Sequence, residues 1–274
     1  MKRHRFTAAA VLAAALPAGS AFALPFAGTP TAGSPDSLLL FDTDDLSVTT
    51  PGPALGGDFV RGLDLSANLT GYYIVTGGFS FDPSTFGLYE LNNGVSTFVS
   101  NLGGIDDTSV GGLSLSADGS FLYFVGDLVD NDGGDEIYTI SLTGSISAPT
   151  VITNSLDEPD FAGLAVAPDG TVYGLANDTD SLYTIDPGTG VATLVGETGF
   201  SFFGVSGLDF GPDGQLYAAL GDDIATLDLA TGTATVLGDV GPSLSNLAYN
   251  PPIPEPSTLA LAGVGALAAL RRRR

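Results

Sequence analysis

Residues 163–196 read GLAVAPDGTVYGLANDTDSLYTIDPGTGVATLVG, the clearest copy of a unit that recurs along the chain. Short runs of apolar and β-branched residues alternate with glycine-containing turns, which is the pattern of β-strands joined by hairpins. The Asp-Gly pair at 169–170 supplies the positive backbone angle that a tight hairpin turn needs. The stretch therefore predicts four strands, at about 163–167, 171–176, 181–186 and 191–196, which we name A to D.

The opening glycine of this unit marks each copy. It is found at Gly62, Gly112, Gly163 and Gly207, and a truncated fifth copy has Asn246 in its place. The spacings of 50, 51, 44 and 39 residues match the length of a four-stranded propeller blade. The repeat thus predicts an all-β propeller. A two-sheet sandwich is the alternative, but repeats of this length argue against it.

The two ends of the repeat region together predict one more blade. SLLLFDTDDLSVTT at 37–50 has the pattern of strands C and D, whereas SNLAYNP at 245–251 has that of a strand A. Their pairing would close a ring of about five blades, although no strand B for this composite blade is evident. The units resemble NHL, SMP-30 and YVTN-type propeller repeats over residues 37–250. This resemblance implies the fold and leaves the function open.

Both chain ends carry targeting signals outside the repeats. Residues 1–23 combine basic residues, an apolar run and small residues before a cleavage site after Ala23, as in a secretory signal peptide, and 24–36 is a predicted linker. Residues 251–274 combine a proline-rich stretch, a predicted short apolar helix at 259–270 and four arginines. Such a helix, about 18 Å long, is marginal for a hydrocarbon core of roughly 30 Å.

This C-terminal order resembles the PEP-CTERM sorting signal of exported proteins in Gram-negative bacteria that make extracellular polysaccharide. The residues that carry the resemblance are Pro254, Glu255, Pro256, Ser257, Thr258, Arg271, Arg272, Arg273 and Arg274. It implies transient anchoring in the inner membrane, processing by an exosortase-type enzyme, and delivery to the cell surface or extracellular matrix. Signal peptidase would act at the other end. A plain C-terminal membrane tail is the alternative.

Composition excludes several classes of function. The net charge is −23, and thirty of the 31 Asp and Glu residues lie between Leu24 and Ile253, where Arg61 is the one Lys or Arg. Such a charge repels nucleic acid, which we do not expect as a partner. The chain has no cysteine, and its one histidine is His4. Within the repeats this excludes Ser-His-Asp triads, cysteine nucleophiles and sites built on His or Cys ligands.

Neighbouring strands run in opposite directions, so their connections lie on two faces. The short A–B and C–D turns form one face, named the turn face, where Asp118, Asp169 and Asp213 are predicted turn formers. The irregular B–C and D–A connections form the other, named the loop face, where propellers usually bind ligands. Carboxylates beside aromatic rings suit sugars. The candidate ligand residues on this face are Phe161, Phe200, Phe202, Phe203, Asp178, Asp180, Asp222 and Asp223.

One acidic loop is a candidate metal site. Asp127, Asp130, Asp132 and Asp135 place hard oxygen ligands at the close spacing that suits Ca²⁺, although the run is not an EF-hand. A solvated acidic loop is the alternative interpretation. No other cofactor is expected.

Two functional hypotheses remain. The first is a non-enzymatic module at the cell surface or in the matrix that binds extracellular polysaccharide or a surface protein, with or without calcium. The second is a carboxylate- or calcium-dependent hydrolase, lactonase- or glycosidase-like, on the same face. Two carboxylates facing each other in the central funnel would favour the enzyme, and a funnel filled by apolar side chains would favour the binding module.

Overall fold

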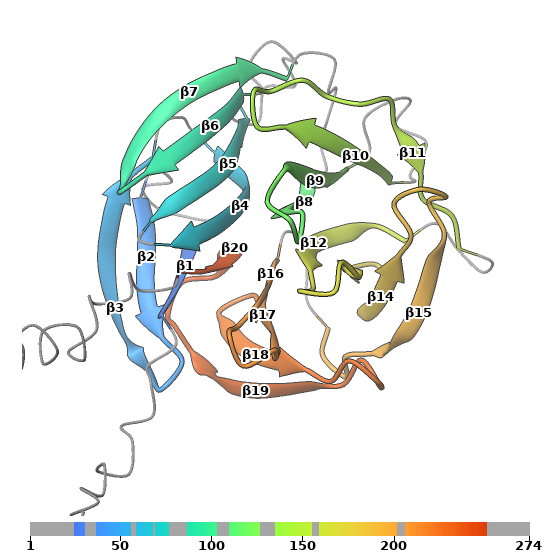
Figure 1. Ribbon diagram of the computed structural model, residues 1–274. Coiled ribbons are helices and arrows are strands. Elements are labelled where there is room, and N and C mark those ends of the chain that lie inside the picture. Colours follow the sequence, from blue (N-terminus) through green and yellow to red (C-terminus); the bar gives the residue numbers. More distant parts are fainter. Residues whose placement is uncertain are drawn as a thin grey trace, which may run out of the picture.

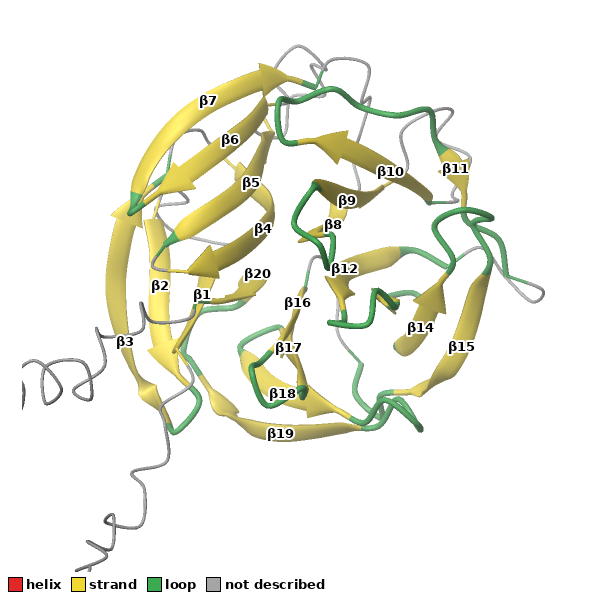
Figure 2. Cartoon of the chain, viewed as in Figure 1, coloured by secondary structure: helices red, strands yellow, loops and turns green. Residues whose placement is uncertain are grey.

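Twenty strands form five four-stranded antiparallel sheets around a common centre (Figure 1). The computed structural model describes residues 25–30, 37–55, 59–67, 69–76, 87–102, 110–126, 135–154, 159–201 and 206–250. We number the sheets as blades I to V. Figure 2 shows that the described connections between strands are loops and turns. Strand A of each blade lies innermost and strand D outermost, so the predicted five-bladed propeller of four-stranded blades is confirmed.

The blades follow the repeats in chain order. Blade I contains β4 (Phe59–Ala67), β5 (Thr70–Thr76), β6 (Gly87–Asn92) and β7 (Val95–Asn101). Blade II contains β8 (Val110–Leu115), β9 (Phe121–Gly126), β10 (Glu136–Ser141) and β11 (Thr150–Val151). Blade III contains β12 (Phe161–Val166), β13 (Val172–Ala176), β14 (Ser181–Ile185) and β15 (Ala192–Glu197), close to the limits predicted from the repeat. Blade IV contains β16 (Gly207–Phe210), β17 (Leu216–Leu220), β18 (Asp223–Leu227) and β19 (Ala234–Asp239).

Blade V joins the two ends of the repeat region, and it supplies the strand that the sequence analysis missed. Its order is β20 (Leu244–Tyr249), β1 (Pro25–Pro30), β2 (Ser37–Asp42) and β3 (Asp45–Ala54). Strand B is β1, which lies inside the segment predicted as a linker and pairs Phe26 with Tyr249 on one side and with Phe41 on the other. No turn signal precedes β1, because the A–B turn of this blade is replaced by the two chain ends.

Glycines let neighbouring blades approach closely near the centre. A Cβ atom on Gly62 would lie 2.5 Å from the Cβ of Leu113, and one on Gly207 would lie 2.0 Å from the backbone nitrogen of Leu247. The recurrence of glycine at this position of the repeat thus reflects packing between blades rather than turn formation. Outside this inner ring, five apolar clusters each join two neighbouring blades, so the hydrophobic core lies between the sheets.

The turn face is built as predicted. Gly119, Gly170 and Gly214 have positive φ angles of 69°, 91° and 77°. The aspartate before each of them accepts a backbone N–H two residues further on, as in the 2.9 Å bond from Thr171 to Asp169 Oδ1. These aspartates are therefore turn formers.

The seam between blades V and I uses a polar residue where the other seams use glycine. Asn246 is 4% exposed, and its Nδ2 donates to Thr29 Oγ1 at 2.6 Å and to the Val60 carbonyl at 3.0 Å. This side chain links β20 to both its own blade and the next one.

Removing this side chain is expected to weaken ring closure. Asn246→Ala would remove two buried hydrogen bonds that join β20 to β1 and β4, at a cost of about 1–3 kcal/mol in the free energy of unfolding. Urea denaturation followed by circular dichroism measures this loss. Asn92→Ala, on the exposed C–D turn of blade I, is the control and should change stability by less than about 0.5 kcal/mol. Equal effects of the two substitutions would contradict the assigned role of Asn246.

The predicted signal peptide at residues 1–23 lies outside the residues that the structure describes. The predicted C-terminal apolar helix lies outside the described residues. Among the residues that are described, no helix is long and apolar enough to cross a membrane.

Candidate functional site

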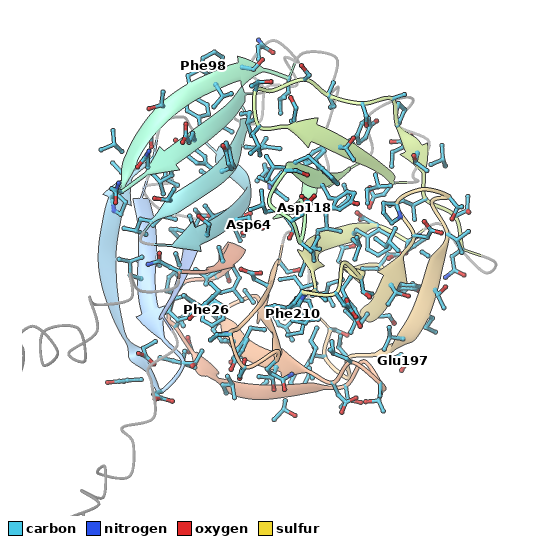
Figure 3. All side chains as sticks on the ribbon, in the orientation of Figure 1. Phe26, Asp64, Phe98, Asp118, Glu197 and Phe210 are labelled. Carbon is cyan, nitrogen blue, oxygen red and sulfur yellow. The ribbon has the colours of Figure 1, made fainter. Side chains whose placement is uncertain are left out.

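A groove opens on the loop face of blade III, with a volume of about 330 Å³. Two connections form it: the B–C loop between β13 and β14, and the chain that follows β15. The residues that line it are Thr179, Asp180, Glu197, Gly199, Phe200 and Ser201. Glu197 lies toward the outside of the ring (Figure 3). The groove is therefore peripheral rather than central.

A buried threonine fixes the shape of the groove. Thr198 is fully buried, and its backbone N–H and its Oγ1 both donate to the Asp180 carbonyl at 2.9 Å. Its Oγ1 also accepts the Phe200 N–H at 3.2 Å, and the Phe200 carbonyl, 3.0 Å away, shares the single hydroxyl proton with the Asp180 carbonyl. Asp180 has a positive φ of 50°, which turns the chain sharply there. The two loops are thus held together by one side chain.

The groove combines an aromatic ring with carboxylates. Phe200 is 39% exposed, which is a large exposed fraction for a phenylalanine. Beside it, Ser201 Oγ donates to Asp180 Oδ2 at 2.8 Å, and Glu197 is exposed. An exposed ring can pack against the apolar face of a sugar, while the carboxylate oxygens accept hydrogen bonds from hydroxyl groups.

The structure separates the predicted ligand residues. Phe200 and Asp180 lie together in the groove, whereas Asp222 and Asp223 belong to the neighbouring blade IV. Phe161 is 1% exposed and packs edge-on against Tyr183 at 5.7 Å between ring centroids, so it is a core residue. Phe202 and Phe203 lie outside the described residues.

Asp178 holds the B–C loop in place, and three residues of the groove were not predicted from the sequence. Asp178 Oδ1 accepts the Asp160 N–H at 3.1 Å, which ties the B–C loop to the start of β12. The sequence analysis missed Thr179, Glu197 and Ser201. No local sequence pattern marks these residues, because each lies at the end of a strand or after one. Only the folded loops bring them together.

The predicted calcium ligands are only partly described. Asp127, Asp130 and Asp132 lie outside the described residues. Asp135 is 2% exposed, and its Oδ2 accepts the Phe161 N–H, which joins the start of β10 in blade II to β12 in blade III. Within the described ranges, no group of three or more Asp, Glu, His or Cys side chains is placed to hold a metal ion. Calcium at this loop stays a prediction.

The innermost strands leave little space between them at the level of the repeat glycines. The leucine that follows each repeat glycine lines a central cavity of only about 10 Å³, with Ser206 and Asn246 at its border. A cavity of that size is at the limit for a single water molecule. A ligand therefore cannot enter the channel at this level.

One position further along strand A, two carboxylates lie close to the centre; Figure 3 shows Asp64 there. Asp64 Oδ2 accepts the Leu115 N–H at 2.5 Å and the Ser114 hydroxyl at 3.1 Å, both from the next blade. Asp209 Oδ2 accepts the Tyr249 N–H of its own next blade at 2.7 Å. Each carboxylate therefore accepts a backbone N–H on the inner edge of the innermost strand in the next blade.

These aspartates also compensate for alanines at the same repeat position. Ala165 and Ala248 have no side-chain oxygen that could accept a backbone N–H from the innermost strand of the next blade. Instead, Asp209 Oδ1 accepts the N–H of its own neighbour Phe210 at 2.7 Å, and Asp64 accepts the N–H of Leu65 in the same way. Ser114 Oγ fills the remaining position by accepting the Val166 N–H at 3.1 Å. The central carboxylates thus have a structural role.

Both central carboxyl groups hold their protons more tightly than usual. Burial raises the pKa of Asp64 to about 6, although its backbone and Ser114 hydrogen bonds act in the opposite direction. Burial raises the pKa of Asp209 well above its ordinary value, and the nearby negative charge of Asp64 raises it further. The pair is therefore a source of electrostatic strain at neutral pH. In the sequence, these two repeats have an aspartate at the position where the other repeats have Ser or Ala. This difference was not used to predict the central pair.

Comparison with known proteins identifies the C-terminal tail. Residues 252–274 match the PEP-CTERM protein-sorting motif, so the chain carries this sorting signal at its C-terminus. The motif indicates export with a membrane-anchored sorting signal, as in Gram-negative bacteria, and it implies processing by an exosortase. No curated protein matches the sequence.

Solved structures similar to this chain include three with low sequence identity. Hydrazine synthase of Kuenenia stuttgartiensis matches with 20% identity and a TM-score of 0.34, over 49% of this chain and 37% of that one. Puromycin hydrolase matches with 18% identity and a TM-score of 0.43, over 84% and 40%. A candidate gluconolactonase matches with 16% identity and a TM-score of 0.49, over 83% and 85%. The chain thus spans about two fifths of the length of the first two.

Proposed function

We propose that this exported propeller, which carries a PEP-CTERM sorting motif, is a surface or matrix protein that binds neutral glycans in the blade III groove. The observation that carries the proposal is the exposed Phe200 ring beside the carboxylates of Asp180 and Glu197 in a groove of about 330 Å³. Extracellular polysaccharide is the partner whose chemistry fits these groups.

Charge and preorganisation support this choice of ligand. The net charge of −23 disfavours acidic polymers, so a neutral glycan is the better match. Thr198 holds both groove loops in one arrangement, and a preorganised site loses less conformational entropy on binding. The centre of the ring offers no comparable site, because its cavity has a volume of only about 10 Å³ and its carboxylates accept hydrogen bonds from backbone N–H groups.

The proposal predicts the effect of removing the aromatic ring. Phe200→Ala should weaken binding of a neutral glycan about tenfold, equivalent to about 1.4 kcal/mol, because the stacking surface is lost. Screening the purified protein on a glycan array, with and without calcium, supplies the ligand, and calorimetry then measures the affinity. Any glycan bound is also screened for hydrolysis, which tests the hydrolase alternative on the same face.

A matched control exists on the outside of the ring. Phe98 is 56% exposed on β7 of blade I, far around the ring from the groove (Figure 3). Phe98→Ala should leave glycan affinity unchanged. Failure to bind any neutral glycan, or an equal loss of affinity in both variants, would refute the groove as the binding site.

A further inference from the structure

We propose that, while the C-terminal tail is in the membrane, the propeller is held with its turn face toward the bilayer and its loop face toward the surroundings. This inference rests on the sorting motif and on where the chain ends leave the ring. It does not depend on glycan binding in the groove.

The chain leaves the propeller on the turn face, close to the axis. The innermost strand β20 runs toward this face and ends at Tyr249. The next residue, Asn250, accepts the Leu69 N–H at 2.7 Å through its Oδ1, and Leu69 belongs to the A–B turn of blade I. The Leu69 carbonyl in turn accepts the N–H of Gly94 in a C–D turn. The point where the tail begins is thus tied to turns of the neighbouring blade.

The N-terminal end lies on the same face. Pro25 begins β1 and pairs with Asp42, where the C–D turn of blade V starts, and Phe26 pairs with Tyr249 at the end of β20. The two chain ends therefore take the place of the A–B turn in blade V. The predicted cleavage site after Ala23 lies directly before Leu24, one residue ahead of β1. Both processing signals consequently leave the ring side by side.

The connection to the membrane is short compared with the body. The eight residues 251–258 can span at most about 29 Å, whatever their conformation. Residues 25–250 are expected to have a radius of gyration of roughly 17 Å, which corresponds to a diameter of roughly 45 Å. To bring the loop face to the bilayer, the tail would have to cross one radius of roughly 22 Å and then the length of a six-residue strand, about 20 Å. The tail is too short for that path.

The charge of the turn face sets how the body sits above the bilayer. Its turns carry the exposed carboxylates of Asp44, Asp118, Asp169, Asp186, Asp213 and Asp228. Anionic lipid headgroups repel this face within the Debye length of about 8 Å at physiological salt. The body is therefore held off the surface, within the reach of the tail. Pro254, Glu255 and Pro256 then lie in the gap, where a membrane enzyme can reach them.

Single cysteines can test the orientation, because the native chain has none. Ala230→Cys places a thiol on the exposed C–D turn of blade IV, and Ser243→Cys places one in the exposed loop between blades IV and V on the loop face. The full-length variants are expressed in a Gram-negative host that lacks an exosortase. The membrane fraction of spheroplasts is treated with a membrane-impermeant PEG-maleimide. Each labelling rate is divided by that of the same variant with residues 251–274 deleted.

The expected result is a difference between the two faces. Ala230→Cys should react several-fold more slowly when the tail is present, whereas the rate for Ser243→Cys should be nearly the same with and without the tail. Equal protection of both cysteines, or no protection of Ala230→Cys, overturns the proposal. Recovery of the full-length chain only in the soluble fraction also overturns it. Loss of glycan binding changes none of these outcomes, so the two proposals fail separately.

Discussion

Gly207→Ala is expected to lower the free energy of unfolding by about 3 kcal/mol or more, the upper range for overpacking a tight core. The new Cβ would lie 2.0 Å from the backbone nitrogen of Leu247 and 2.3 Å from the backbone carbon of Asn246. Backbone atoms cannot rotate away as a side chain can, so the seam between blades IV and V would have to open. Urea denaturation measures the loss.

Gly163→Ala is the matched control at the equivalent position of blade III. Its Cβ would meet the Leu208 Cβ and the Ser206 carbonyl at 3.2 Å, so small shifts suffice. Alanine is also favoured over glycine inside a strand by roughly 0.5–1 kcal/mol, which offsets part of the crowding. The net change should be about 1 kcal/mol or less. If the two variants lose the same stability, close approach of the blades does not explain the repeat glycine.

Acidification from pH 7 to about 4.5 is expected to stabilise the propeller, the reverse of the usual acid effect. The pKa of Asp64 is about 6 in the folded protein against an ordinary value of 3.8, so between these values the folded state binds a proton that the unfolded chain does not. Stability therefore falls as pH rises through this window. A shift of about two pKa units corresponds to about 3 kcal/mol. The raised pKa of Asp209 acts in the same direction.

The turn aspartates limit the gain in stability once the pH falls below about 4. Hydrogen bonds from backbone and hydroxyl groups in the turns lower the pKa values of Asp118, Asp169, Asp186 and Asp228. Their contribution to stability is present above the unfolded pKa of about 3.8 and is lost as pH falls below it. The stability maximum should therefore lie between about pH 4 and pH 5. Thermal unfolding across pH 3 to 8 locates it.

Asp64→Asn distinguishes two contributions to the gain in stability on acidification: protonation of the central carboxyl pair and the general loss of negative charge. Both donors from blade II reach the same oxygen, Asp64 Oδ2, so one amide oxygen can accept them, while the Leu65 N–H loses its acceptor. We expect removal of the buried charge to outweigh the loss of this one bond. The variant should be more stable than the native protein at pH 7 and should gain less on acidification. Asp169→Asn, on an exposed turn, should lose stability at pH 7 instead, because its lowered pKa marks a favourable charge. A native pH profile in Asp64→Asn would refute this account.

Local sequence predicted most of the architecture, because a propeller repeats one unit. Alternating strand residues, Asp-Gly turns and the glycine at 62, 112, 163 and 207 are short-range signals, and each depends on the chain within one blade. They set the five blades, the strand limits of blade III and the two faces. Strand β1 was not predicted, because Pro25–Pro30 has prolines at both ends and lacks the turn that precedes strand B in the other blades.

The sites required contacts that no local pattern encodes. Asp64 reaches Leu115, 51 residues away, and Asp209 reaches Tyr249, 40 residues away, so their roles appear only when blades stand side by side. The aromatic residues show the same limit: Phe161 and Phe200 look alike in sequence, but the blade II–III seam buries one and the groove exposes the other.

The sequence by itself determined the export signals, the acidic character and the repeating strands, because each is written in neighbouring residues. Tertiary structure alone decided which carboxylates lie at the centre of the ring and which line the groove. It also decided that both chain ends leave through the same face. The physical reason is that each blade completes its packing and its hydrogen bonds on the next one, at a distance along the chain that local sequence does not specify.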